Sequence, residues 1–332
     1  MATIKDVAKE AGVSIATVSR VINHSPKASE ASINAVTLAM KKLGYRPNAA
    51  AKALVSQSSN TVGVLVGDVS DPFFGTLVKA VDNVAHQHGK HILVGNGYHD
   101  AEMEKRSIEL LISNRCDALI IHSKALSDQQ LIAYANEVKG MVLINRHIDE
   151  IAKRCISLDN HRGAYLATEF LIRHGHTHIG YLSSSHGIED CQARLQGYQQ
   201  ALKDHQLEFH ASYVESSEPN SDGGEQAMTN LLAKALPISA IVAYNDHMAA
   251  GALSVLDENA IAVPEKMSIV GFDDGLIARY VKPRLTTIRY PIELMATKAT
   301  ELALCHSDPG SRAQTLTFQP TVVKRDSVSR RA

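Results

Sequence analysis

The chain has 332 residues, of which 45% are hydrophobic and 21% charged, and its formal net charge is −1. This length suits two or three domains rather than one small core, and the composition excludes a mainly disordered, collagen-like or coiled-coil protein. No apolar run approaches the roughly 20 residues that a membrane-spanning helix needs. The first residues lack the basic-then-apolar order of a secretory signal, so we expect a cytoplasmic protein without membrane contact.

The near-zero net charge divides unevenly along the chain. Residues 1–58 contain eight Lys and Arg against three Asp and Glu, a balance of +5, and the remainder carries −6. A basic head on an acidic body is typical of a protein in which one part meets a polyanion and the other does not.

The basic head has the pattern of three short helices. Thr3 can cap a first helix, Gly12 can end it in the left-handed conformation, and Ser14 can cap a second helix. A third helix is predicted between Ser29 and Gly44. Two helices joined by a short glycine-containing turn and braced by a third form a helix-turn-helix, whose second helix enters the DNA major groove.

The outward face of the second helix suits the reading of DNA. Arg20 can form two hydrogen bonds to guanine, and Ser19 and Asn23 can reach phosphates or base edges. Ile15 and Ala16 can touch a thymine methyl group. The alternative is a small amphipathic bundle whose outer face is merely solvated, and the helical pattern alone leaves both interpretations open.

Specific motifs favour the first interpretation. They are Ile4-Lys5-Asp6-Val7-Ala8, Ala11-Gly12-Val13-Ser14, Thr17-Val18-Ser19-Arg20-Val21-Ile22-Asn23 and Gly44-Tyr45-Arg46-Pro47-Asn48. Together they resemble the head of the LacI/GalR family of bacterial transcription repressors. The resemblance implies that operator DNA is contacted by Thr3, Ser14, Ile15, Ala16, Thr17, Ser19, Arg20 and Asn23. Ile15 and Ala16 match the positions that most often set operator choice, and Arg20 matches a base-reading arginine.

A linker joins the head to the body. Asn48 can cap a short alanine-rich helix over residues 49–55, which is too short to be stable alone. In the family this segment is the hinge helix, which orders when two protomers pair over the operator. Leu54 matches the leucine that wedges into a minor-groove base step, and Asn48 and Lys52 are further candidate DNA contacts. The alternative is that Leu54 is an ordinary linker leucine.

From Thr61 onward, short β-branched runs alternate with helical stretches. Predicted strands lie at 62–66, 91–94, 118–121, 141–144, 178–182, 240–243 and 268–272. Predicted helices lie at 74–88, 102–113, 162–174, 190–204, 225–235, 247–259 and 291–305. Such alternation predicts parallel sheets covered by helices, and the body is too long for one such sheet, so we expect two.

Polar and aromatic side chains follow the predicted strands, at the edge where parallel α/β sheets bind ligands. Singly, an aspartate there is more often a helix cap and a phenylalanine more often part of the core. Together, carboxylates, amides and an arginine supply hydrogen bonds to vicinal hydroxyls, and an aromatic face packs on the C–H side of a sugar ring. The pattern therefore predicts a site for a small polar ligand.

The body resembles the type I periplasmic sugar-binding fold that the rest of this family shares, and the resemblance covers essentially the whole chain. The motifs Val66-Gly67-Asp68-Val69-Ser70-Asp71-Pro72-Phe73-Phe74-Gly75 and Tyr244-Asn245-Asp246-His247-Met248-Ala249-Ala250-Gly251 look closest to its galactose-responsive members. The implied effector contacts are Asp71, Phe73, Arg194, Asn245 and Asp273, with Asn145 and Asp159 as second-rank candidates. The resemblance implies a homodimeric repressor of galactose transport and catabolism genes, induced by D-galactose or D-fucose. A purine or another sugar is the alternative effector.

The expected architecture is an α plus α/β protein, with a helix-turn-helix headpiece followed by a two-subdomain body of the periplasmic-binding-protein type. We expect the headpiece at 1–45, the hinge helix and linker at 46–60, and the body at 61–332. Its N-subdomain would comprise about 61–160 and 291–320, and its C-subdomain about 161–290 and 321–332. Family members cross three times between these subdomains, which makes a hinged cleft.

Other signals were weighed against this interpretation. His174, His176 and His178 could bind a metal, but no fourth ligand is nearby. The four cysteines have no CxxC spacing and fit small buried residues. Neither a GxSxG elbow nor a phosphate-binding loop occurs, so we expect no enzyme, no cofactor and no metal.

Overall fold

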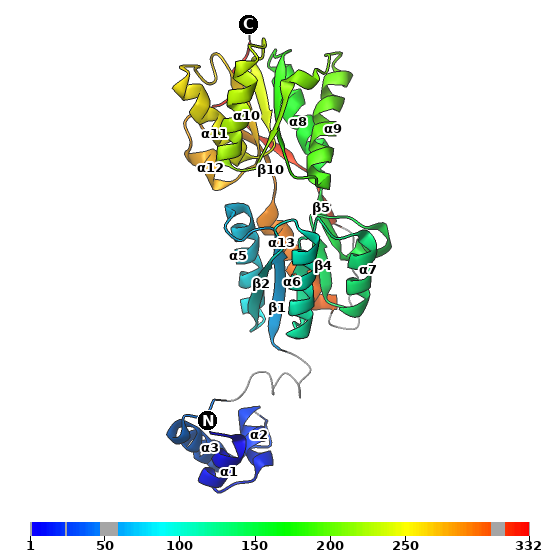
Figure 1. Ribbon diagram of the computed structural model, residues 1–332. Helices are drawn as coiled ribbons and strands as arrows, with labels where there is room; N and C mark the ends of the chain where they lie inside the picture. The colour runs from blue at the N-terminus through cyan, green and yellow to red at the C-terminus, as the bar shows by residue number, and fades with distance from the viewer. Residues whose placement is uncertain (1, 24, 47–58, 307–315, 332) are drawn as a thin grey trace. The chain divides into compact units, whose positions relative to one another are not determined.

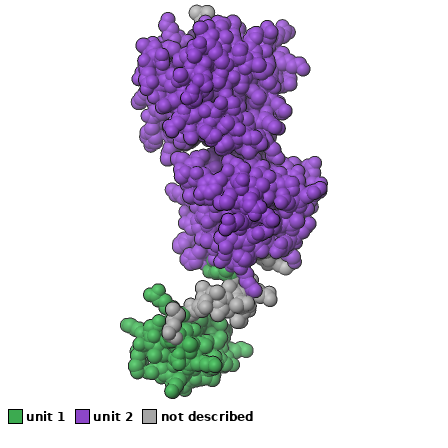
Figure 2. Space-filling view, in the orientation of Figure 1, with its two compact units in different colours: residues 1–60 green, residues 61–332 purple. Residues whose placement is uncertain are grey.

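The computed structural model describes residues 2–23, 25–46, 59–306 and 316–331. The chain forms two compact units, residues 1–60 and residues 61–332 (Figure 2). Among the described residues, no helix combines the length and the apolar character of a membrane span. The predicted hinge helix, with Asn48, Lys52 and Leu54, lies outside the described residues.

The first unit contains the three predicted helices: α1 (Ile4–Ala11), α2 (Ile15–Ile22) and α3 (Glu30–Leu43). Their small common core includes Val7 and Val18, which are fully buried. The backbone N–H and C=O groups at the ends of a helix have no partner within the helix. In a unit with so few apolar side chains, capping residues that bind these groups make an important contribution to stability.

The predicted caps of these helices are confirmed. Thr3 forms a reciprocal capping box with Asp6, and Ser14 accepts the backbone N–H of Thr17. Gly12 and Gly44 end α1 and α3 with φ angles of 66° and 60°, which is the left-handed region that glycine adopts at little cost.

The second unit contains two six-stranded sheets. In spatial order the first consists of β11 (Leu316–Phe318), β5 (Cys155–Leu158), β4 (Met141–Ile144), β3 (Ala118–Ile121), β1 (Thr61–Val66) and β2 (His91–Asn96). The second consists of β12 (Thr321–Val323), β10 (Thr286–Arg289), β9 (Ser268–Asp273), β8 (Ala240–Ala243), β6 (Ile179–Ser184) and β7 (Val214–Ser217). All strand pairs are parallel except β10 with β12. The two predicted parallel sheets are thus confirmed.

Helices cover both sheets, and the two lobes are distinct in Figure 1. The first lobe carries α5 (Pro72–Gln87), α6 (Ala101–Ser113), α7 (Asp128–Glu137), the 3-10 segment Asp149–Arg154 and α13 (Ile292–His306). The second carries α8 (Asn160–Arg173), α9 (Glu189–Asp204), the 3-10 segment Ala211–Tyr213, α10 (Ser221–Ala233), α11 (Asp246–Glu258) and α12 (Leu276–Tyr280).

The chain passes between the lobes after β5, after β10 and after β11. In Figure 2 the purple unit narrows where the two lobes meet. Since the carboxyl ends of parallel strands carry the loops that bind ligands, a cleft between two such sheets can be lined from both sides.

The cysteines are all free, but the prediction that all four are buried is wrong. Cys155 is buried in β5, Cys116 and Cys191 are half-buried, and Cys305 is exposed in the last turn of α13. A solvent-facing position on an amphipathic helix accounts for the last of these.

Candidate functional site

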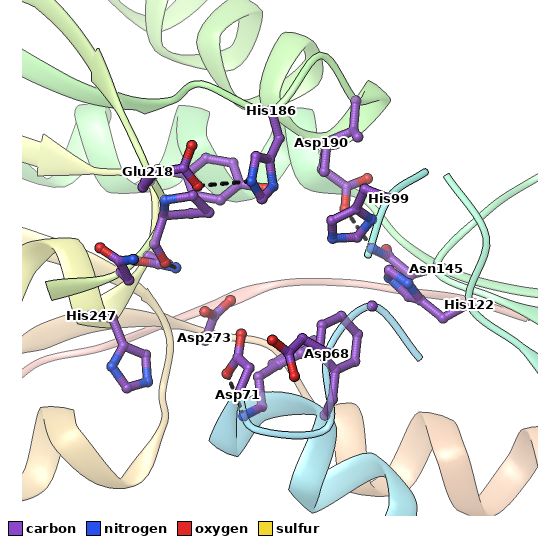
Figure 3. Close-up of a pocket in the computed structure, with 18 of the residues that line it drawn as sticks. Asp68, Asp71, His99, His122, Asn145, His186, Asp190, Glu218, His247 and Asp273 are labelled. Carbon is purple, nitrogen blue, oxygen red and sulfur yellow. Dashed lines mark hydrogen bonds and ion pairs between the residues drawn. The ribbon is translucent and has the colours of Figure 1, made fainter. Parts of the chain in front are cut away.

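A cavity of about 500 Å³ lies between the two lobes of residues 61–332. Its walls are polar and aromatic, and its labelled carboxylates, imidazoles and amide come from both lobes (Figure 3). The sequence-predicted residues that line it are Asp71, Phe73, Asn145, Arg194, Asn245 and Asp273. The structure therefore brings together six residues that lie far apart in the sequence.

Asp159 is the exception and does not line the cavity. Its side chain caps α8 by accepting the backbone N–H of Arg162 at 2.8 Å, and its role as an effector contact stays a prediction. A carboxylate directly before a helix satisfies one of the unpaired N–H groups of the first turn, which explains its presence there. The neighbouring Asn160 supports the site indirectly, because its Oδ1 accepts a hydrogen bond from Arg194.

Arg194, on α9, is 4% exposed and is held by its protein partners. Its Nε donates to Asn160 Oδ1 at 2.9 Å, and its Nη1 donates to the carbonyl of Tyr244 at 2.6 Å. The guanidinium lies over the ring of Phe272 at 3.6 Å, and Nη2 is 3.8 Å from Asp273 Oδ1. A guanidinium has more N–H donors than these contacts use, so Arg194 is fixed in place with donors available at the cavity.

Two residues serve both as helix caps and as cavity walls. Asp71 Oδ1 accepts the N–H of Phe73 at 2.8 Å at the start of α5, and Asn245 Oδ1 accepts the N–H of Met248 at 2.8 Å at the start of α11. Asn245 also donates to the carbonyl of Pro219. These local bonds fix the side chains before any ligand arrives, which limits the entropy lost on binding.

Asp273 ends β9 with a φ of 112°, a backbone conformation that non-glycine residues rarely adopt. The following loop is held by buried Asp246, whose carboxylate accepts the Gly275 N–H at 2.8 Å and the Thr287 hydroxyl at 2.5 Å. Burial raises the pKa of Asp246 to about 7, although both hydrogen bonds oppose that shift. Burial likewise raises the pKa of Asp273, while Arg194 lowers it. Asp246 therefore positions the loop that presents Asp273.

Asp246→Asn should flatten the dependence of stability on pH. A carboxyl with a folded pKa near 7 holds a proton that the unfolded chain releases near its ordinary pKa of 3.8, so stability falls as pH rises between these values. Asp246 should lower the free energy of unfolding of the wild type by about 1 kcal/mol for each pH unit between pH 5 and pH 7. Urea unfolding at both pH values measures the difference between the proteins. A gap that stays constant with pH would contradict the prediction.

Lys124 and Asp190, together with Asn145, tie one lobe to the other beside the cavity. Lys124, after β3, donates to Asp190 on α9 at 2.8 Å and also to the carbonyl of Asn145. Asn145 Nδ2 donates to the other Asp190 oxygen at 2.6 Å, as the dashed line in Figure 3 marks. Burial alone would raise the pKa of Asp190, but Lys124 and Arg194 lower it below its usual value. A charged network thus closes one edge of the cleft.

A second group of polar side chains in the cavity wall includes half-buried His186 and exposed Glu218. His186 Nε2 lies 3.1 Å from Glu218 Oε2 (Figure 3), and Ser185 Oγ donates to the other oxygen of Glu218. His99 of the first lobe faces His186 of the second at 5.2 Å between ring centroids. Side chains of both lobes therefore meet here as well.

In the first unit, the structure exposes the face of α2 that the sequence predicts. Ile15, Ala16, Arg20 and Asn23 are exposed, and Ser19 is half-buried with a hydrogen bond from Asn23 at 3.4 Å. The hydroxyls of Thr3 and Ser14 cap helices, and the Thr17 hydroxyl lies 2.9 Å from that of Ser14. The side chains suited to base edges are therefore free of the core, and the cap residues lie at the helix ends.

The histidine-rich segment finds its hydrogen bonds within the protein. His174 Nδ1 pairs with the carbonyl of Phe170 at 2.7 Å, and His176 pairs with Ser239 at 3.0 Å and with a backbone carbonyl. Within the described ranges, no three His, Cys, Asp or Glu side chains group in a way that could hold a metal ion. These histidines satisfy local polar groups.

Comparison with known proteins identifies the combination of this head and this body. A model described as "Bacterial regulatory proteins, lacI family" matches residues 3–48, and "Periplasmic binding protein-like domain" matches residues 168–328. HTH-type transcriptional regulator GalR of Escherichia coli (strain K12) is 54% identical over 330 residues, which cover 99% of this chain and 96% of the relative. The chain belongs to the LacI family.

Further relatives of this LacI-family protein agree. HTH-type transcriptional regulator GalS of Salmonella typhimurium is 53% identical over 331 residues, covering 99% of this chain and 97% of that protein. The lac repressor dimer bound to operator and the anti-inducer ONPF has a TM-score of 0.85 at 27% identity, with 99% of each chain covered. The CelR–cellobiose complex has a TM-score of 0.72 at 29% identity, covering 98% of this chain and 100% of that one. This LacI-family protein is a transcriptional regulator, and the predicted fold class is confirmed.

Sequence reasoning missed several residues of the LacI-family cavity. The lining includes Asp68, His122, Asp190 and Tyr290, which the sequence did not mark as effector contacts, and it did not mark Lys124 beside the cavity either. His122 directly follows β3, so the rule that led to Asn145 after β4 could also have found it. Tyr290 follows β10, whose strand was itself not predicted.

Proposed function

We propose that this protein is a dimeric repressor that binds a pseudo-palindromic operator through its headpiece and is released by D-galactose or D-fucose. The observation that carries the proposal is the cavity between the lobes, where Asp71, Asp273 and Arg194 face a space of sugar size beside the ring of Phe73. Carboxylates and a guanidinium bind vicinal hydroxyls, and the aromatic ring packs against the C–H face of a pyranose. The protein would act in the cytoplasm, where its DNA is.

Release requires that the sugar bind one arrangement of the lobes better than the other. A ligand with equal affinity for the operator-binding and released states shifts nothing, however tightly it binds. Contacts from both lobes to one ligand supply the difference, because only one relative placement of the lobes satisfies them all. The sugar is bound and released without chemical change.

Operator release is the direct test. An operator selected from a random DNA library with the full-length protein, labelled for fluorescence anisotropy, should dissociate on addition of D-galactose or D-fucose. D-Glucose and hypoxanthine serve as the control sugar and the alternative purine. Release by hypoxanthine alone, or tighter operator binding in its presence, would replace the galactose assignment with that of a purine regulator.

Arg20→Ala should weaken operator binding by about 1–3 kcal/mol while leaving non-specific DNA affinity and sugar binding nearly unchanged. The reason is that Arg20 is exposed on α2, where its guanidinium can form two hydrogen bonds to one guanine. Anisotropy titrations with operator and with scrambled DNA measure the ratio. Lys42→Ala is the matched control, because exposed Lys42 lies on α3 and pairs with Glu10 at 2.6 Å. Equal losses on both DNAs for Arg20→Ala would assign Arg20 to phosphate contact only.

A further inference from the structure

Buried polar atoms without hydrogen-bond partners gather at the cavity. Buried side-chain N and O atoms in folded proteins nearly always have a partner. The described residues contain five buried side-chain atoms without one, and three of these belong to cavity-lining residues: His99 Nδ1, His122 Nδ1 and Tyr290 Oη. His122 and Tyr290 are only 4% and 3% exposed, so bulk water does not compensate them.

Edge-to-face packing fixes both rings in one aromatic row. His122 packs on Phe74 with centroids 4.8 Å apart, Phe74 on Phe73 at 5.2 Å, and Phe73 on Tyr290 at 5.0 Å. The interplanar angles are 71°, 79° and 87°, which is the T-shaped geometry that aromatic rings favour. The two rings that carry the unpartnered atoms are therefore held at opposite ends of a row that passes through Phe74 and Phe73, and rotation of either ring would break this packing.

Both groups are neutral hydrogen-bonding groups. Burial, with the charges of Lys124 and His99, lowers the pKa of His122 to about 3, and burial raises the pKa of Tyr290 well above its ordinary value. A neutral imidazole offers one donor and one acceptor, and a phenol offers one donor with acceptor capacity. Neutral partners of this kind match hydroxyl groups and favour an uncharged ligand over a phosphorylated one.

The cations near the row already have acidic partners. Lys124 is paired with Asp190 at 2.8 Å, and Arg194 lies 3.8 Å from Asp273. Asp71 adds negative charge to the lining, and Asp273 adds a second carboxyl group whose pKa burial raises. The Asp71 carboxylate would repel an anionic ligand. The hydroxyl groups of a neutral polyol can instead form hydrogen bonds with both acidic side chains.

We propose that His122 and Tyr290 are the specificity-determining residues of this site, each hydrogen-bonding one hydroxyl of a neutral hexose whose ring lies on Phe73. The proposal rests on the proposed function and names the groups that distinguish one sugar from another. A sugar that lacks either hydroxyl leaves a buried polar atom unpaired, and sites built on hydrogen bonds reject such analogues strongly.

Calorimetric titration of the full-length protein with D-galactose, its 2-, 3- and 4-deoxy analogues and D-fucose, which is the 6-deoxy sugar, tests this. Tyr290→Phe removes one oxygen and keeps the ring, so it should weaken D-galactose binding by about 10- to 100-fold. It should bind one particular deoxy sugar as well as the wild type does, because that sugar has lost the same hydrogen bond. His122→Leu should behave in the same way toward a different deoxy sugar, and His122→Asn, which keeps a polar atom close to Cβ, should recover part of the affinity.

The outcomes distinguish failure of this proposal from failure of the proposed function on which it rests. Wild-type affinities for D-galactose in Tyr290→Phe and His122→Leu would overturn the assignment of both residues and leave the sugar site standing. Equal losses for every sugar would show that the rings act only through packing and would also overturn it. If the wild type bound none of the sugars in the panel, both the proposed function and this inference would be overturned.

Discussion

Arg194→Ala will give a protein that binds operator DNA normally but no longer releases it with D-galactose. The substitution removes a guanidinium that is 4% exposed and is aligned on the cavity by Asn160 and the carbonyl of Tyr244. Truncating a buried, hydrogen-bonded charge at a binding site costs about 2–5 kcal/mol, so sugar affinity should fall by at least ~30-fold. Calorimetry with D-galactose and anisotropy with labelled operator measure the two properties separately.

Arg162→Ala is the matched control for this substitution. Arg162 lies on α8, is exposed, and stacks on the ring of Tyr165 at 4.8 Å, so it has the same side chain outside the cavity. It should bind sugar and release operator like the wild type. Arg194→Lys separates charge from geometry, because an ammonium cannot reproduce the planar donor set and should recover little. Normal induction of Arg194→Ala by galactose would remove Arg194 from the effector site.

Strands were predictable from the sequence where apolar runs are continuous. A strand that is buried on both faces has apolar residues at every position, so its sequence stands out. β3, with the sequence Ala-Leu-Ile-Ile, and β4, with Met-Val-Leu-Ile, were predicted with the bounds that the structure has. β7, with Val-Glu-Ser-Ser, is a polar edge strand, and β11 and β12 have only three residues each, so neither hydrophobicity nor length marked them. α7 was missed because its helical pattern is weak and only Leu131 and Ala135 of it are buried.

The site was predictable only as far as strand ends could be read one at a time. Asn145 directly follows the apolar strand β4 and Asp273 ends the apolar strand β9, whereas Asp159 shows that a helix cap and a ligand contact look the same in the sequence. The pairing of Lys124 with Asp190 has no sequence signature, because 66 residues separate its members and they meet only through the closure of two lobes. Tertiary geometry, not residue type, decides which polar groups become a network.

Lys124→Met will destabilise the body more than the double substitution Lys124→Met with Asp190→Leu. The Lys124 side chain is 1% exposed and that of Asp190 10%, so the single change leaves a buried carboxylate without its cation. Such a change costs about 3–5 kcal/mol, whereas replacing both partners of a buried pair with apolar groups is often close to neutral. Urea unfolding followed by far-UV circular dichroism measures both, since the chain has no tryptophan for fluorescence. A double variant as unstable as the single one would contradict this account of the pair.

The pH dependence of the stability lost in Lys124→Met identifies the cause of that loss. In the wild type the lowered pKa of Asp190 contributes stability above the ordinary pKa of 3.8, and that contribution is lost as pH falls. In Lys124→Met the carboxyl loses its paired cation and only Arg194 still opposes the effect of burial, so its pKa rises and it takes up a proton more readily as pH falls. The stability deficit of Lys124→Met should therefore be smaller at pH 5 than at pH 8. Lys298→Met, which removes an exposed lysine paired with Glu301 at 2.7 Å, should stay within about 0.5 kcal/mol of the wild type at both pH values. Lys124 and Asp190 belong to different lobes. A stability deficit that changes with the charge of Asp190 would therefore show that the ionic contact, rather than side-chain packing, holds the lobes together at this edge of the cleft.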